Sequence, residues 1–273
     1  MYRIVAGLFL LGVCLGVSAV GMGAETVQVP IIMYHSLVRS GSSTGIGAEE
    51  FEADLKYLQE HGYQAVHLSD LVDFVHHGMP LPEKPIVLTF DDGYYNNYSL
   101  GLPLVQRYDT KIVVSVIGRD TEIWSENPAG IDEKDGHLTW DQIGEMVDTG
   151  LVEIGNHTWD LHKIERGRKG CAMKVGEDRT QYRQMLWEDV GRLQDCLGEL
   201  SGVRPIGFTY PFGNLCPEAG EILREMGFLV TLSCYDGVNT LVQGDEACLY
   251  EMRRYDRSPE RSVREILEDV VGS

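Results

Sequence analysis

The chain has 273 residues, of which 43% are hydrophobic, and a formal net charge of −19 at pH 7. This length and composition suffice for one large α/β domain or two small ones, each with a full hydrophobic core. Because the strong negative charge repels nucleic acid and anionic lipid headgroups, we expect neither as a partner.

The first 24 residues predict a secretory signal peptide. One early positive charge, Arg3, precedes an apolar stretch that runs from residue 4 to residue 20, and small residues follow. The stretch is near the lower length limit for a membrane span, so an uncleaved N-terminal anchor is the alternative. In both cases we expect residues 25–273 to form a single domain that is secreted or lies in the cell envelope, outside the cytoplasm.

Six cysteines are present, and one of them, Cys14, lies in the predicted signal peptide. The remaining five cannot all pair within one chain. One disulfide, between Cys234 and Cys248, is a candidate in an oxidising compartment. No Cys-x-x-Cys pair is present, which argues against a zinc site made of thiolates.

After the signal peptide, predicted strands and helices alternate along the chain. Apolar residues at three- and four-residue spacing and terminal glycines mark the helices, and Ser69 and Ser258 are predicted N-caps. The predicted strands are 30–34, 63–68, 85–90, 111–118, 151–158, 205–211, 228–234 and 248–256. The predicted helices are 48–62, 69–78, part of 96–109, 139–150, 179–202, 216–227 and 258–271. This alternation predicts an α/β fold with a parallel sheet, which seven or eight units would close into a barrel.

Polar side chains follow several of the predicted strands. In parallel α/β folds the chemistry lies at the carboxyl ends of the strands. The strand 85–90 ends in Asp91 and Asp92, two adjacent carboxylates whose repulsion a cation would relieve, although Asp-Gly is also common in turns. His157 lies at the end of the strand 151–158 and His162 follows it, while His35 follows the strand 30–34.

One aspartate with two histidines is an ordinary ligand set for a metal with open coordination positions. Zinc is the expected ion, because two imidazoles and one carboxylate suit it. Non-haem Fe(II) oxygenases use the same set, but the α/β alternation argues against that class. The segment after 205–211, which contains Phe212, could present backbone N–H groups to an anion.

Three segments together resemble a known family. TFDDG at 89–93, GNHTWDLH at 155–162 and FTYPFG at 208–213 are similar to the first three motifs of the polysaccharide deacetylase family, also called the NodB-homology domain or carbohydrate esterase family 4. The order and separation of the motifs fit, and the resemblance covers roughly 83–271. It implies a single domain with the distorted (β/α)7–8 barrel of these deacetylases.

The resemblance also implies roles for individual residues. Asp91 is the expected catalytic base, and Asp92, His157 and His162 are the expected ligands of a divalent metal, Zn²⁺ by preference. The five-residue histidine spacing and the leading Met-Tyr-His resemble the branch that deacetylates poly-N-acetylglucosamine. In that branch the general acid comes from the N-terminal strand, which makes His35 the candidate here. The backbone N–H of Phe212 is expected to stabilise the oxyanion.

The chain departs from the family pattern at two places. Many relatives carry an arginine where this chain has Thr209, and Arg253 or Arg254 is the candidate to replace it in orienting Asp91. The late Leu-x-x-His motif is missing, so His35 would supply the acid from the other end of the chain. The segments 119–138 and 163–178 are expected to be loop insertions that shape substrate access.

An acetylated glycan is therefore the expected substrate, and removal of its N-acetyl groups is the expected reaction. One alternative is a peptidoglycan or chitooligosaccharide deacetylase, and another is an O-acetyl esterase of the acetylxylan type. A third is an inactive glycan-binding module, which would have no need of Asp91 beside a full metal-ligand set. No feature of the sequence indicates the oligomeric state.

Overall fold

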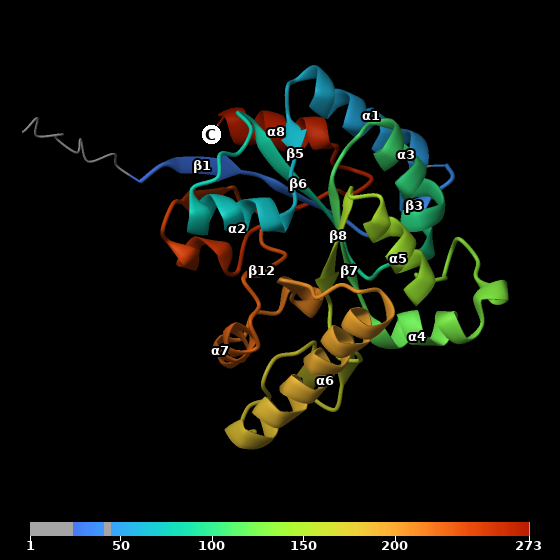
Figure 1. Cartoon of the computed structure of the whole chain (residues 1–273), viewed down its shortest axis with the longest axis vertical. Helices are drawn as coiled ribbons and strands as arrows, with labels where there is room; N and C mark the ends of the chain where they lie inside the picture. Colours follow the sequence, from blue (N-terminus) through green and yellow to red (C-terminus); the bar gives the residue numbers. More distant parts are fainter. Residues whose placement is uncertain (1–23, 41–44, 273) are drawn as a thin grey trace, which may run out of the picture.

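The computed structural model describes residues 24–40 and 45–272, in which eight parallel strands form one curled sheet (Figure 1). In spatial order the strands are β12 (Val230–Leu232), β11 (Gly207–Thr209), β8 (Val152–Asn156), β7 (Ile112–Val116), β6 (Pro85–Phe90), β2 (Ile31–Tyr34) and β14 (Tyr255–Asp256), while β5 (Gln64–Ala65) pairs with β6. A parallel bridge joins Leu232, in β12 at one end of the row, to Met252, three residues before β14 at the other end. The predicted distorted α/β barrel is confirmed.

Helices surround the strands, and the chain adds a few short pieces of sheet at the periphery (Figure 1). The α-helices are α1 (Ala48–Glu60), α2 (Leu68–His77), α3 (Leu102–Arg107), α4 (Gly118–Glu126), α5 (Trp140–Asp148), α6 (Arg179–Leu200), α7 (Pro217–Glu225) and α8 (Val263–Gly272). The small two-stranded pairs are β1 (Thr26–Val29) with β13 (Asn239–Val242), β3 (Leu37–Val38) with β4 (Ile46–Gly47), and β9 (Ile164–Glu165) with β10 (Arg168–Lys169). Short 3-10 or π-helical turns are η1 (Asn97–Gly101), η2 (Pro128–Gly130), η3 (Pro211–Gly213) and η4 (Glu246–Leu249).

Alternate residues of the buried strands point to opposite faces of the sheet. Ile32 and Leu88 belong to a cluster with apolar residues of α1, α3, α5, α6 and α8, whereas Ile31 and Val87 belong to a second cluster with α2. Both faces of the sheet are therefore covered, which explains why strands such as β6 are apolar throughout.

Several local predictions were wrong, and side-chain capping explains most of them. The last helix begins at Val263 and not at 258, because Ser262 and Glu265 form a capping box there. Helix α2 has His67 as its N-cap, and the Ser69 hydroxyl donates to Glu153 instead. Only Tyr255 and Asp256 of the predicted strand 248–256 are extended in a ladder, since η4 covers its first residues.

The predicted insertions contain regular structure. Helix α4 begins one residue before 119–138 and occupies its first part, the turn η2 lies within it, and the β9–β10 hairpin lies within 163–178. The predicted disulfide is wrong, because Cys234 and Cys248 are both free thiols. The predicted signal peptide or anchor lies outside the described residues except for its last position. Within the part that is described, no helix has both the length and the apolarity to cross a membrane.

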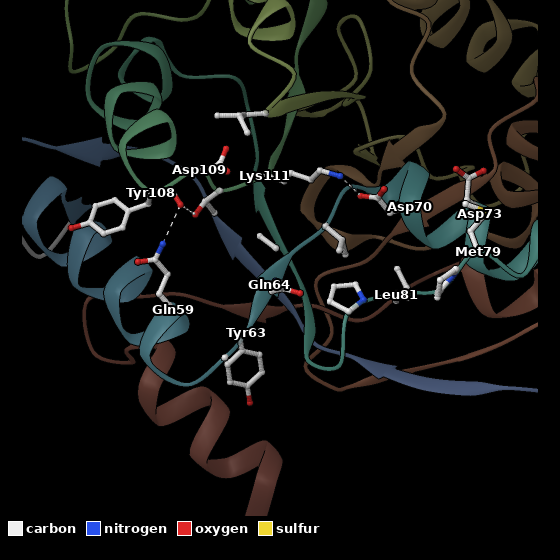
Figure 2. A pocket seen from close by; sticks show the side chains of 17 residues that line it. Gln59, Tyr63, Gln64, Asp70, Asp73, Met79, Leu81, Tyr108, Asp109 and Lys111 are labelled. Carbon is white, nitrogen blue, oxygen red and sulfur yellow. Dashed lines mark hydrogen bonds and ion pairs between the residues drawn. The ribbon is translucent and has the colours of Figure 1, made fainter.

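A hollow of about 690 Å³ opens between β5 and the residues that lead into β7 (Figure 2). Polar groups line it, including an ion pair between Lys111 and Asp70 (2.7 Å) and a hydrogen bond from the Gln59 amide to the Tyr108 carbonyl (3.2 Å). The hollow lies at the amino ends of the strands. None of the predicted site residues lines it, so the chemistry must be sought at the other end of the sheet.

Candidate active site

Asp91 follows β6 directly and is held by a buried arginine. Asp91 is 2% exposed, and Arg254 is fully buried. The two terminal guanidinium nitrogens of Arg254 donate to the two carboxylate oxygens of Asp91, both at 2.7 Å. Burial raises the pKa of Asp91, but the charge and hydrogen bonds of Arg254 together with the charges of His157 and His35 outweigh this effect, so the net pKa is lowered. The carboxylate is therefore ionised at neutral pH.

The choice between Arg253 and Arg254 is thereby decided in favour of Arg254. Its Nε donates to the Ser233 carbonyl (2.7 Å), and one terminal nitrogen also donates to the Thr89 hydroxyl (3.0 Å). Arg253 is exposed and donates to the Asp236 carbonyl. Arg254 immediately precedes β14, which pairs with β2 on one edge of the sheet, so its place depends on strand order and not on local sequence.

The other predicted polar residues come together next to Asp91. Asp92 Oδ1 lies 3.4 Å from His157 Nε2 and 3.5 Å from His162 Nε2. One ligand atom from each of these three residues lies within 4.8 Å of the others, a spacing that could hold a metal ion. His157 follows β8, and Asp92 follows β6 with a positive φ of 70°, which for a non-glycine residue costs about 1 kcal/mol.

The hydrogen bonding of His157 defines which nitrogen faces Asp92. His157 Nδ1 lies 2.7 Å from the carbonyl oxygen of Thr209, which can only accept, so Nδ1 carries the proton. In the neutral imidazole, Nε2 then presents its lone pair to Asp92 Oδ1. That oxygen is buried and makes no hydrogen bond of good geometry within the described residues.

Positive charge is favoured at this point of the site. Burial lowers the pKa of His157, but Asp92 and Asp91 raise it more strongly, so the net pKa is raised. Burial and the neighbouring His157 lower the pKa of His162. An orphaned carboxylate oxygen that faces two imidazole nitrogens fits a divalent cation, and these donors suit zinc.

His35 and Phe212 lie at the same carboxyl edge of the sheet. β2 pairs in parallel with β6, with Tyr34 opposite Phe90, so His35 and Asp91 follow neighbouring strand ends. His35 is exposed and close enough to lower the pKa of both Asp91 and Asp92. The Phe212 ring stacks on His162 with centroids 4.4 Å apart. Phe212 has a φ of 60° in the turn η3, directly after β11.

Two residues near the site did not emerge from the sequence. Tyr94 is half-buried next to Asp92, and burial together with that carboxylate raises the pKa of Tyr94 to about 12. Its position directly after Asp-Asp-Gly was the available signal. Asp189 contacts the segment between His157 and His162 from the middle of α6, and no local pattern marks it.

Comparison with known proteins is consistent with this geometry. The model of the polysaccharide deacetylase family matches residues 78–231, which include Asp91, Asp92 and both histidines. The chain belongs to the polysaccharide deacetylase family. Metal dependence is general in this family, and Asp92, His157 and His162 form a group that could hold an ion among the described residues.

Relatives within the family are named for deacetylation of one polymer. The poly-β-1,6-N-acetyl-D-glucosamine N-deacetylase of Escherichia coli K12 is 29% identical over 210 residues, 69% of this chain and 31% of that protein. This deacetylase chain therefore spans less than a third of the length of that relative.

Solved structures of the family have the same fold. IcaB from Ammonifex degensii is 27% identical, with a TM-score of 0.71 over 85% of this chain and 93% of IcaB. A de-N-acetylase from Aggregatibacter actinomycetemcomitans has a TM-score of 0.72 at 24% identity, over 89% of this chain and 99% of that chain. At that lower identity the likeness concerns the fold alone.

Proposed function

We propose that this deacetylase is a metal-dependent hydrolase that removes N-acetyl groups from a polysaccharide containing N-acetylglucosamine. The observation that carries the proposal is the cluster of Asp92, His157 and His162 beside the ion-paired carboxylate of Asp91. The names of the relatives support the substrate class. An acetylated glycan is accordingly the substrate, and the products are acetate and a free amine.

Asp92, His157 and His162 hold the metal, and Zn²⁺ is the ion that this ligand set favours. When bound, such an ion would polarise the acetyl carbonyl and lower the pKa of a water molecule. The Thr209 carbonyl fixes the tautomer of His157, which keeps its Nε2 free to bind. This hydrogen bond is made within the chain, so it orients the His157 imidazole before any ion binds.

Asp91 is the general base. Arg254 keeps its carboxylate ionised and fixes its orientation through two hydrogen bonds of 2.7 Å. The water loses its proton to Asp91 while its oxygen forms the new bond to the acetyl carbon. A base with a lowered pKa suffices when the attacking water has itself been made more acidic.

His35 is the general acid. Amide cleavage breaks the C–N bond, and the departing nitrogen must gain a proton, because an amide anion is too basic to leave. Protonated His35 donates that proton to the nitrogen. Its imidazole is exposed at the carboxyl edge, while the preceding Tyr34 is buried and donates its hydroxyl to Asp54 (3.0 Å), which anchors the end of β2.

The backbone N–H of Phe212 stabilises the negative charge that develops on the acetyl oxygen. Its position beside His162 supports this role, since the Phe212 ring stacks on that imidazole. One such donor typically contributes about 3 kcal/mol to the transition state. A backbone donor does not depend on whether the side chain is Tyr or Phe.

The enzyme acts outside the cytoplasm, on an extracellular or cell-envelope polymer. Support comes from the N-terminal sequence, where residues 1–24 have the pattern of a signal peptide or anchor and 25–273 form the deacetylase domain. The relatives named for poly-N-acetylglucosamine deacetylation are consistent with such a polymer.

Acetate release from poly-N-acetylglucosamine tests the proposal. Acetylated xylan, which carries O-acetyl groups, is the comparison substrate. The wild-type protein should release acetate from the first polymer, and chelation followed by zinc addition should abolish and restore the activity. Asp92→Ala should lower the rate at least about 10²-fold at any zinc concentration tested, because second-sphere changes alone reach that size. Activity that survives both chelation and Asp92→Ala would refute the mechanism.

A further inference from the structure

The five-residue spacing between His157 and His162 places a turn between them. Thr158 has a φ of 74°, and its backbone N–H donates to the Asn156 side chain (2.9 Å). The Leu161 N–H donates to the Thr158 hydroxyl (3.2 Å). These local bonds shape the turn, but none of them fixes where the turn lies relative to Asp92.

Asp189 of α6 contacts the middle of this turn. Its Oδ1 accepts from the Trp159 N–H (2.8 Å) and its Oδ2 from the Asp160 N–H (3.0 Å). One carboxylate thus satisfies two successive backbone donors, an arrangement that requires both oxygens to be acceptors. Asparagine would retain one acceptor and turn an NH₂ group toward the second N–H.

The opposite side of the turn is tied to the start of α4. The Trp159 carbonyl accepts from the Arg119 N–H (2.8 Å), and the Thr158 carbonyl accepts from the Gly118 N–H (3.1 Å). The Trp159 ring is covered by the Arg192 guanidinium, 3.7 Å from the ring centroid, one turn after Asp189 on α6. The turn is therefore held from two sides, and α6 provides one of them.

The two histidines depend on this turn to different degrees. His157 has its own anchor in the Thr209 carbonyl. His162 lies at the far end of the turn, and its ring is held by stacking on the half-exposed Phe212. Its distance from His157 and Asp92 is consequently set by the backbone between 157 and 162.

The Asp189 carboxylate is held at a cost to stability. Burial raises its pKa to about 6, an effect that Asp160 adds to and Lys163 opposes, while the two N–H donors favour the ionised form. At neutral pH a partly buried charge is therefore maintained here, and it binds two backbone amides. A charge that reduces stability and fixes a turn between two metal ligands indicates a positioning role.

We propose that Asp189 is a positioning residue, which sets His162 relative to His157 and Asp92 and thereby determines how tightly the site binds a divalent ion. The proposal rests on the metal site of the proposed function, but it concerns ion binding and not the identity of the glycan. It predicts that Asp189 variants lose metal affinity while they keep the fold.

The test measures Zn²⁺ and Co²⁺ dissociation constants of the whole metal-free protein, for wild type, Asp189→Asn and Asp195→Asn. Asp195 is the matched control, because it is an exposed aspartate on the same helix. We expect Asp189→Asn to raise both dissociation constants about 10-fold or more, and Asp195→Asn to leave them within about twofold. The visible absorption of bound Co²⁺ should change in Asp189→Asn, since its ligand geometry changes.

Urea unfolding and circular dichroism establish that each variant is folded. If Asp189→Asn does not fold, Asp189→Ser, which keeps one small acceptor, takes its place with the same expected direction. Wild-type affinity and an unchanged Co²⁺ spectrum in a folded Asp189 variant would overturn the proposal, and so would a wild-type protein that binds neither ion. Wild-type protein that binds metal but releases no acetate would contradict the proposed function and leave this inference standing.

Discussion

At the scale of single residues, Arg254 keeps Asp91 of the site ionised. A fully buried guanidinium and a nearly fully buried carboxylate are each costly to desolvate, and the pair is tolerated because both partners are hydrogen bonded. Loss of Arg254 would leave Asp91 as an unpaired buried charge. The pair therefore links the stability of the domain to the ionisation of the proposed base.

Arg254→Met should lower the free energy of unfolding at pH 7 by about 3 kcal/mol, because breaking a buried pair leaves its partner uncompensated. The lowered pKa of Asp91 stabilises the folded wild type above the pKa of the unfolded chain, and this contribution is lost as pH falls through the folded pKa. In the variant, Arg254 no longer opposes the effect of burial, so the pKa of Asp91 is higher than in wild type. The deficit should consequently shrink between pH 7 and pH 4.

Urea unfolding of the metal-free proteins measures this effect, and Arg253→Met is the matched control. Arg253 is exposed, so its variant should lie within about 1 kcal/mol of wild type at every pH. Equal losses in the two variants would contradict the assignment of Arg254 as the partner of Asp91.

His35 can be tested by comparing two leaving groups. Amide cleavage needs a proton on the departing nitrogen, whereas an aryl acetate releases a stable phenolate without one. His35→Asn should therefore reduce N-acetyl hydrolysis about 10²-fold or more and aryl acetate hydrolysis much less. His61→Asn, a change of another exposed histidine, controls for surface effects. If both reactions decline equally after His35→Asn, His35 is not the acid.

At the scale of elements, strand order brings the site together. β2, β6, β8 and β11 run in parallel within one sheet, so their carboxyl ends deliver His35, Asp91, His157 and the η3 turn to the same edge. Helix α6 adds the tie to the turn between the histidines. Residues that follow a strand directly were predictable, because alternation of strands and helices implies a parallel sheet.

What the sequence did not reveal depended on contacts between distant segments. Arg254 reaches Asp91 through the pairing of β14 with β2, a partner more than 200 residues away in the chain. The segment 248–256 has the apolar pattern of a strand, but the Asp245 side chain accepts from the Ala247 N–H (3.1 Å) and starts the turn η4. Ser262 and Glu265 have the sequence pattern of a capping box. Ser258 and Pro259 also have the pattern of a helix start, and the prediction followed them.

The contact between Asp189 of α6 and the turn between the two histidines predicts that stability depends on pH. Since the folded pKa of Asp189 lies near 6, above that of the unfolded chain, its contribution to stability is full below about pH 4. That contribution is lost as pH rises through 6. The free energy of unfolding of wild type relative to Asp189→Asn should therefore fall by about 2 kcal/mol from pH 4 to pH 7.

Denaturant unfolding with a chelator present measures this difference across the pH range. Asp195→Asn should follow wild type at every pH, because its carboxylate is exposed. Parallel curves for wild type and Asp189→Asn would show that the Asp189 charge is not held at a cost.

At the scale of the whole molecule, the polar chemistry lies at one end of the barrel and the hollow of Figure 2 at the other. The chain is acidic overall, with a net charge of −19, whereas N-deacetylation turns a neutral glycan into a cationic one. The buried guanidinium of Arg254 is engaged by Asp91, Thr89, Ser233 and Cys234. An added cation at Asp92 would therefore supply the positive charge that amide hydrolysis requires.

The most direct measurement is the anomalous scattering of a crystal grown with Zn²⁺. We expect one strong peak about 2.0–2.2 Å from an Asp92 oxygen and from Nε2 of both His157 and His162. Asp91 should remain paired with Arg254 beside that ion. A peak at any other place, or an ion that lacks one of these three ligands, would contradict the account.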